Sequence, residues 1–165
     1  MVWLVRPLPQ APPDYPGVVI YLDGSALMRF LPGVRYYDEW VAWALPRLPE
    51  FVTTQLGLTE LRQAAELYPR ETKSQAFEIV EQVKARVPTI RFSDANVSVS
   101  THAAAVLKPF AALHIGAAVT HPDVDTVATY DSELARVAIL YQLKVVTPGM
   151  PDGWQNDIAR PQASV

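Results

Sequence analysis

Short apolar runs alternate along the chain with longer segments in which apolar residues recur at helical spacing. Residues 18–22 are continuously apolar and are followed by Asp23-Gly24, which is typical of a buried strand in a parallel sheet. The same pattern predicts further strands at residues 51–54, 89–92, 126–130 and 144–147, and helices at residues 25–31, 37–45, 56–68, 71–87, 94–107, 109–119 and 132–142.

The alternation of strands and helices indicates the fold class. Strands separated by helices of about ten or more residues pair in parallel, because each helix carries the chain back across a face of the sheet. We therefore predict an α/β protein, a three-layer α/β/α sandwich with a central, mostly parallel sheet. Residues 17–149 are expected to form this domain, between a proline-rich lead-in at residues 1–16 and a loose C-terminal tail at residues 150–165.

Composition and charge exclude several classes of protein. Apolar residues make up 50% of the chain and charged residues 19%, which excludes a disordered protein. The net charge of −3 leaves no broad basic field, so any nucleic acid must be held locally. The absence of cysteine excludes thiol catalysis and thiolate metal sites, and it is compatible with a cytoplasmic location. We expect no signal peptide and no membrane span.

Carboxylates follow two of the predicted strands. Asp23 comes directly after the first strand, and Asp131 comes directly after the strand predicted at residues 126–130. In parallel sheets, functional groups gather at the edge formed by the carboxyl ends of the strands. Either residue could instead be a simple helix N-cap. Ser25 and Thr129 stand beside them, placed to orient a carboxylate or a metal-bound water, or to form local backbone hydrogen bonds.

A third carboxylate, Glu60, lies within the helix predicted at residues 56–68. It shares a helix stripe with Ala64 and Leu67, so it is expected to face inward or to lie at the rim of a pocket. The alternative is a solvent-facing side chain paired with Arg62 or Gln63. Three converging carboxylates repel one another unless a cation is present, and Mg²⁺ or Mn²⁺ suits such oxygen ligands.

Four segments in register carry a resemblance to a known family. YLDGSAL, LTELR, LKPFAALHIGAAV and VATYDSELARVA, followed by LKVVTPG, cover residues 18–149 and resemble the PIN-domain fold, in particular the VapC-type toxins of bacterial toxin–antitoxin pairs. The resemblance implies an endoribonuclease that uses one or two Mg²⁺ or Mn²⁺ ions to activate water against an RNA phosphodiester. It also implies that Asp23, Glu60 and Asp131 are the catalytic metal ligands.

One acidic position of that family pattern is changed in this chain. The family usually has an aspartate directly before the sequence Ala112-Leu113-His114, and here that position is Ala111. A natural loss, a deliberate Asp-to-Ala inactivation and a site that works with three acids all remain open. Because a ligand is missing, we expect cleavage to be weak or absent. His114, inside an apolar helix, is expected to be a structural histidine.

The resemblance further implies binding partners. These are an RNA substrate, a VapB-type antitoxin and a second copy of the chain in a homodimer. The candidates for contact with RNA phosphates are the basic residues Arg29, Arg35, Arg62 and Lys108. A group of aromatic residues is compatible either with a protein interface or with core packing: Tyr36, Tyr37, Trp40 and Trp43.

Two other functions remain open at this point. The first is a catalytically dead PIN domain that binds an antitoxin or RNA, and Ala111 favours it. The second is an unrelated α/β enzyme. A haloacid-dehalogenase-like phosphatase would need a second aspartate two residues after Asp23, where Ser25 stands, and glycine-rich phosphate-binding motifs are absent.

Overall fold

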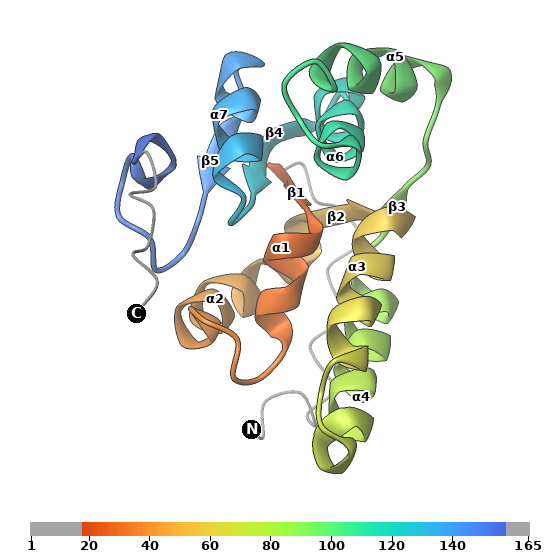
Figure 1. The fold of residues 1–165 in the computed structure, drawn as a ribbon, viewed down its shortest axis with the longest axis vertical. Helices are drawn as coiled ribbons and strands as arrows, with labels where there is room; N and C mark the ends of the chain where they lie inside the picture. The colour runs from red at the N-terminus through yellow and green to blue at the C-terminus, as the bar shows by residue number, and fades with distance from the viewer. Residues whose placement is uncertain (1–17, 158–165) are drawn as a thin grey trace, which may run out of the picture.

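A computed structural model describes residues 18–157, and its centre is a five-stranded parallel sheet in the order β3-β2-β1-β4-β5 (Figure 1). The predicted lead-in at residues 1–16 lies outside the described residues. The strands are β1 (Val19–Leu22), β2 (Phe51–Thr54), β3 (Thr89–Ile90), β4 (Val124–Ala128) and β5 (Lys144–Val146). The predicted α/β/α sandwich is thereby confirmed.

Helices cover both faces of the sheet. They are α1 (Gly24–Leu27), α2 (Tyr37–Ala44), α3 (Gln55–Glu66), α4 (Arg70–Arg86), α5 (Asp94–Ala103), α6 (Pro109–Thr120) and α7 (Ser132–Leu140), with 3₁₀ turns η1 (Met28–Phe30), η2 (Leu45–Glu50) and η3 (Trp154–Asn156). Among the described residues no helix is both long and apolar enough to cross a membrane.

The alternation of side chains along β1 divides the core into two layers. Ile20 and Leu22 face a cluster that includes residues of α1, α2, α3 and α4. Tyr21, which points to the other face, joins a second cluster built with α5, α6 and α7. Successive side chains of a strand point to opposite faces, so one buried strand holds both helical layers together. In Figure 1, α3 and α4 run side by side along one end of the sheet.

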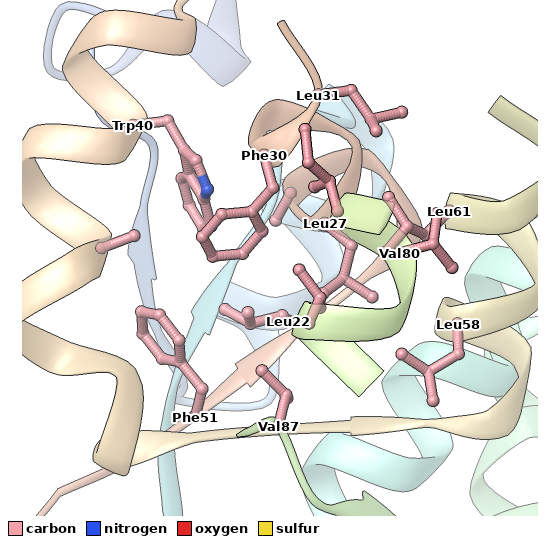
Figure 2. Packing of buried hydrophobic residues seen from close by; sticks show 14 of the residues in the cluster. Leu22, Leu27, Phe30, Leu31, Trp40, Phe51, Leu58, Leu61, Val80 and Val87 are labelled. Carbon is pink, nitrogen blue, oxygen red and sulfur yellow. The ribbon is translucent and has the colours of Figure 1, made fainter. Parts of the chain in front are cut away.

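An aromatic group fixes α2 against the sheet (Figure 2). Trp40 is fully buried, with Phe30 edge-on at 5.4 Å and Phe51 stacked at 6.2 Å between ring centroids. These separations lie within the range in which aromatic pairs attract beyond their buried area. The indole Nε1 of Trp40 is buried without a hydrogen-bond partner, so this residue acts through its apolar surface.

The strand order reverses at β1, because β2 and β3 lie on one side of it and β4 and β5 on the other. In open α/β sheets, ligands bind in the crevice beyond the carboxyl ends of the strands at this switch point. Asp23 follows β1, while Thr129 and Asp131 follow β4. The topology therefore brings these residues to the edge where a site is expected.

Several boundaries differ from the sequence prediction, among them the end of the third strand, which is predicted at residue 92 and lies at Ile90. The helix predicted at residues 94–107 ends at Ala103, and Ser93 is its N-cap. It ends early because the following residues form tight turns that lead into Pro109, the first residue of α6. The strand predicted at residues 126–130 is β4, which ends at Ala128 because its partner β1 also ends there. In the segment predicted as a loose tail, η3 lies against α7.

The packing of Trp40 predicts a contrast between two substitutions. We expect Trp40→Ala to lower the free energy of unfolding by about 3–5 kcal/mol, because it leaves a cavity among packed rings. Trp40→Phe keeps most of the apolar surface and removes a donor that has no partner, so its loss should stay below about 1.5 kcal/mol. Urea unfolding of both variants measures the difference. Equal losses would contradict this account of the core.

Candidate active site

Asp23 is the most buried acidic residue of the site. It is 2% exposed and is the N-cap of α1, at the point where β1 ends. Its Oδ1 accepts hydrogen bonds from the Ala26 backbone N–H at 2.8 Å and from the Ser25 hydroxyl at 2.7 Å. Its Oδ2 accepts one from the Thr129 hydroxyl at 2.5 Å. Three donors from two separate segments thus hold the carboxylate in one orientation.

The environment of Asp23 acts on its pKa in two directions. Burial raises the pKa, because desolvation penalises the charged form. Positive charge on His114 opposes this rise most strongly, followed by the hydrogen bonds from Thr129, Ser25 and Ala26. The rise prevails, so ionising this carboxyl group costs more than it does in water.

Glu60 reaches the same region from α3. Its carboxylate lies directly over Gly24, where any Cβ would overlap with it, so the glycine after Asp23 is required for this close approach. Glu60 Oε2 lies 2.6 Å from Nε2 of His114, which is 3% exposed. The side chain of Glu60 itself is 24% exposed. It is partly exposed and has a histidine as its partner, rather than Arg62 on its own helix.

His114 joins Glu60 to a buried tyrosine. Its Nδ1 lies 2.7 Å from the Tyr21 hydroxyl, which lies 3.2 Å from Oγ1 of Thr54. Thr54 in turn caps α3 by accepting from the Gly57 N–H. Since α3 carries Glu60, the hydrogen bonds form a closed loop through β1, β2, α3 and α6.

The loop satisfies its polar atoms in either protonation state of His114. Burial raises the pKa of Tyr21, so its hydroxyl keeps its proton. If this hydroxyl donates to Nδ1, then Nε2 carries the imidazole proton and donates to Glu60. A protonated His114 donates from both nitrogens, and Tyr21 then donates to Thr54. His114 is therefore a satisfied, buried histidine that also belongs to the carboxylate site.

Asp131 behaves as a helix cap. Its Oδ1 accepts from the backbone N–H groups of Glu133 at 2.9 Å and Leu134 at 3.1 Å, at the start of α7. Its own backbone N–H donates to Thr129 Oγ1 at 3.0 Å. The Thr129 hydroxyl therefore connects the backbone of Asp131 to the carboxylate of Asp23.

Ala111 lies on α6, three residues before His114 and so on the same side of the helix. It is half-buried and packs against the apolar cluster of α5, α6 and α7. An aspartate at this position would start one helical turn from the imidazole that contacts Glu60.

The expected metal ligands are not arranged as a cation site. Within residues 18–157, no three carboxylate or imidazole side chains are grouped so that they could hold a metal ion. The hydrogen bonds explain this: Asp23 is enclosed by donors, Glu60 faces His114, and Asp131 caps α7. The set Asp23, Glu60 and Asp131 does not fit a divalent cation in this arrangement.

The family model of the PIN domain matches residues 20–140. The chain belongs to the PIN-domain family. Members of this family are generally nucleases that hydrolyse nucleic acid, typically with divalent metal ions. No curated protein matches the chain closely enough to add a narrower activity. The PIN assignment fits the geometry, since the matched region includes the switch point and the three acids beside it.

The basic residues and the aromatic residues that the sequence offers as candidates for binding lie in different parts of the structure. Arg29 lies over the ring of Tyr130 at 4.3 Å and Arg35 over the ring of Tyr36 at 4.7 Å, whereas Arg62 lies over Phe77. Lys108 is the exposed N-cap of α6. Of the two interpretations left open for the aromatic group, core packing is the one that holds for Trp40, which is fully buried between α2 and the sheet.

Sequence reasoning did not foresee that Tyr21 and His114 contact each other. The available signal was a polar ring within each of two strongly apolar segments, because a buried polar group needs a partner. Pairing the two segments required the position of α6 on the Tyr21 face of the sheet.

The raised pKa of Asp23 predicts a pH dependence of stability. The folded state holds the Asp23 proton to higher pH than the unfolded chain, whose carboxyl pKa is about 3.9. The contribution of Asp23 to the free energy of unfolding is therefore complete below that pH. It is lost as the pH rises through the pKa that Asp23 has in the folded state. We expect Asp23→Asn to unfold at a higher temperature than the unaltered chain at pH 7, with the gap shrinking toward pH 4. A pH-independent gap would contradict this.

The Glu60–His114 contact predicts a measurable coupling. A double-mutant cycle with Glu60→Ala and His114→Ala should give a coupling energy of about 1.5–3 kcal/mol, which is the range for hydrogen bonds to charged groups. The exposed pair Lys73–Glu66, at 3.7 Å, is the matched control and should give no more than about 1 kcal/mol. Chemical unfolding of all variants supplies both values. Equal coupling energies in the two pairs would show that the buried contact stabilises the fold no more than an exposed ion pair does.

Proposed function

We propose that this PIN domain is an endoribonuclease toxin of the VapC type, and that its cleavage is weakened or lost because Ala111 replaces an acidic residue. The observation that carries the proposal is the buried carboxylate of Asp23 at the switch point, with Glu60 packed over Gly24 beside it. In such a nuclease, Asp23 and Glu60 are the side chains that would hold a divalent cation, and the cation would supply Lewis-acid chemistry at the phosphodiester.

The same contacts support weak activity. Glu60 already uses Oε2 in its contact with His114, and Asp23 already accepts three hydrogen bonds, so both carboxylates have fewer free lone pairs for Mg²⁺ or Mn²⁺. Ala111 supplies no carboxylate on the α6 side. The chain therefore retains the surroundings of a cation site but has too few free oxygen ligands for tight binding.

The proposal extends to the partners of such a toxin. They would be a VapB-type antitoxin and a second copy of the chain, in the cytoplasm. Large apolar side chains on two helices are available for such contacts: Phe110 on α6 is 56% exposed and Leu140 on α7 is 79% exposed. A protein partner that covered these side chains would remove their apolar surface from water.

A second candidate function is a binding module that does not cleave RNA. The closed hydrogen-bond loop of Glu60, His114, Tyr21 and Thr54 favours this function, because these hydrogen bonds give the polar groups of the loop their partners without a cation. Such a protein would keep the fold and its surfaces and use them to bind an antitoxin or RNA.

The substitution Ala111→Asp separates the two functions. If Ala111 marks a lost ligand, the variant should bind Mn²⁺ at least about tenfold more tightly than the unaltered chain and should cleave RNA faster. Calorimetry measures the affinity, and digestion of bulk RNA measures the rate. Ala111→Asn, similar in size and uncharged, is the control and should restore neither.

The outcomes have distinct meanings. Equal rates for the unaltered chain and the Asp variant would contradict the assignment of Ala111 to the missing ligand. An Asp variant that neither binds Mn²⁺ nor cuts RNA would leave the binding module as the function.

A further inference from the structure

The loop after β5 borders a cavity that the carboxylate site does not use. Its volume is about 390 Å³, within the range of roughly 300–1,000 Å³ that is usual for small-molecule pockets. Its walls come from α7, from the end of β5, from the loop that leads to η3, and from Trp43 of α2. Among its described lining residues are none of the three acids Asp23, Glu60 and Asp131. We call it the α7–β5 cavity.

The loop that forms this cavity is fixed by contacts with other segments. The Thr147 hydroxyl donates to the Thr129 carbonyl at 2.8 Å, and the Tyr130 hydroxyl donates to the Pro148 carbonyl at 2.7 Å. Gly149 has φ 90°, and a Cβ there would lie 2.7 Å from a Tyr36 ring carbon, so glycine is needed for both the turn and this contact. A ligand therefore need not order these walls when it binds.

Trp154 is the indole of the cavity that remains available to a ligand. The other indole, Trp43, already stacks on Phe51 with ring centroids 5.6 Å apart, and the Arg47 guanidinium lies over it at 5.2 Å. Within residues 18–157, no aromatic ring and no cationic side chain lies over Trp154, which is half-buried in the cavity wall. Indole faces attract cations, as the Arg47 contact illustrates.

The charge at the cavity is negative. Asp152 is the one charged residue among the lining residues that the structure describes, and it comes two residues before Trp154. The ion pairs found within residues 18–157 join other carboxylates, so no basic side chain of this part of the chain neutralises Asp152. The net charge of the whole chain is also −3. An anion would be repelled here, whereas a cation would meet both a carboxylate and an indole.

Much of the remaining wall is apolar. Ile139, Val145, Pro148 and Met150 all line the cavity. Such side chains favour a ligand with methyl or methylene groups, because contact removes those groups from water. A metal ion has no alkyl surface to bury, and Asp152 alone would give it too few oxygen ligands. The lining therefore favours an organic cation over an inorganic one.

We propose that the α7–β5 cavity binds a small organic cation of the alkylammonium class. The positive head group lies over the Trp154 ring beside Asp152, and the alkyl groups lie against Ile139 and Met150. Attraction between a cation and the face of an aromatic ring is a general means of recognising quaternary ammonium groups. This binding is independent of the proposed nuclease, because it uses neither the carboxylate site nor Ala111.

The test titrates the full chain with three probes that share a shape and differ in charge. Choline is the cation, dimethylbutanol is its neutral isostere with carbon in place of nitrogen, and dimethylbutyrate is the matching anion. Saturation-transfer NMR measures each dissociation constant, because it detects weak binding of small molecules. Choline should bind at least about fivefold more tightly than dimethylbutanol, and dimethylbutyrate should bind most weakly.

Two substitutions assign the binding to the named residues. Trp154→Leu keeps an apolar side chain and removes the ring, so choline should bind at least about fivefold more weakly, while dimethylbutanol changes by less than about twofold. Asp152→Asn should weaken choline binding about twofold at low salt. That loss should fade at high salt, because salt screens the attraction between exposed charges.

Matched controls remove the same groups outside the cavity. Phe92→Leu removes a ring that is 40% exposed after β3, and Asp123→Asn removes an exposed carboxylate before β4. Neither residue lines the cavity, so both variants should bind choline as the unaltered chain does. Melting curves identify any variant that fails to fold. If Trp154→Leu fails, the three probes on the unaltered chain and the exposed substitution Asp152→Asn carry the test.

A preference for choline that Trp154→Leu abolishes and both controls retain supports the proposal. Three results would overturn it: no detectable choline binding, dimethylbutanol binding as tightly as choline, or equal effects of Trp154→Leu and Phe92→Leu. Tightest binding of the anion would also overturn it, since Asp152 would then not govern the charge of the ligand.

Discussion

The buried carboxylate of Asp23 is the constraint on which the rest of the site depends. A carboxylate that is 2% exposed requires donors, and it takes them from α1 and from the end of β4. This need fixes α1 against β1 and holds Thr129 at the switch point. The Thr129 hydroxyl then orders the start of α7 through the Asp131 N–H. One buried carboxyl group thus organises the edge of the sheet.

The fold was predictable because its signals are local and repeated. The strand at residues 51–54 and the start of the helix at Pro109 follow directly from β-branched composition and proline placement. The end of β4 was not predictable, because it depends on the length of its partner β1 rather than on its own residues. The early end of α5 likewise reflects turn formation before Pro109.

The acidic residues were identifiable from their places along the chain, but their partners were not. Strand ends indicated Asp23, and the helix stripe with Ala64 indicated an inward-facing Glu60. The same stripe predicted that Leu67 also faces inward, whereas Leu67 is 86% exposed. Nothing local indicated that Glu60 meets His114, since 54 residues separate them and the contact depends on α3 and α6 approaching from opposite faces. The residues of the site are therefore easier to predict from the sequence than the contacts between their side chains.

The position of β4 between β1 and β5 has a consequence for synthesis of the protein. The Thr129 hydroxyl that satisfies Asp23 comes 106 residues later in the chain. A ribosome must make most of the protein before β1 has β4 as its second neighbour, so one edge of β1 stays open during translation. Such distant pairing also slows folding after release. The surroundings of Asp23 consequently assemble late, when most of the domain has been made.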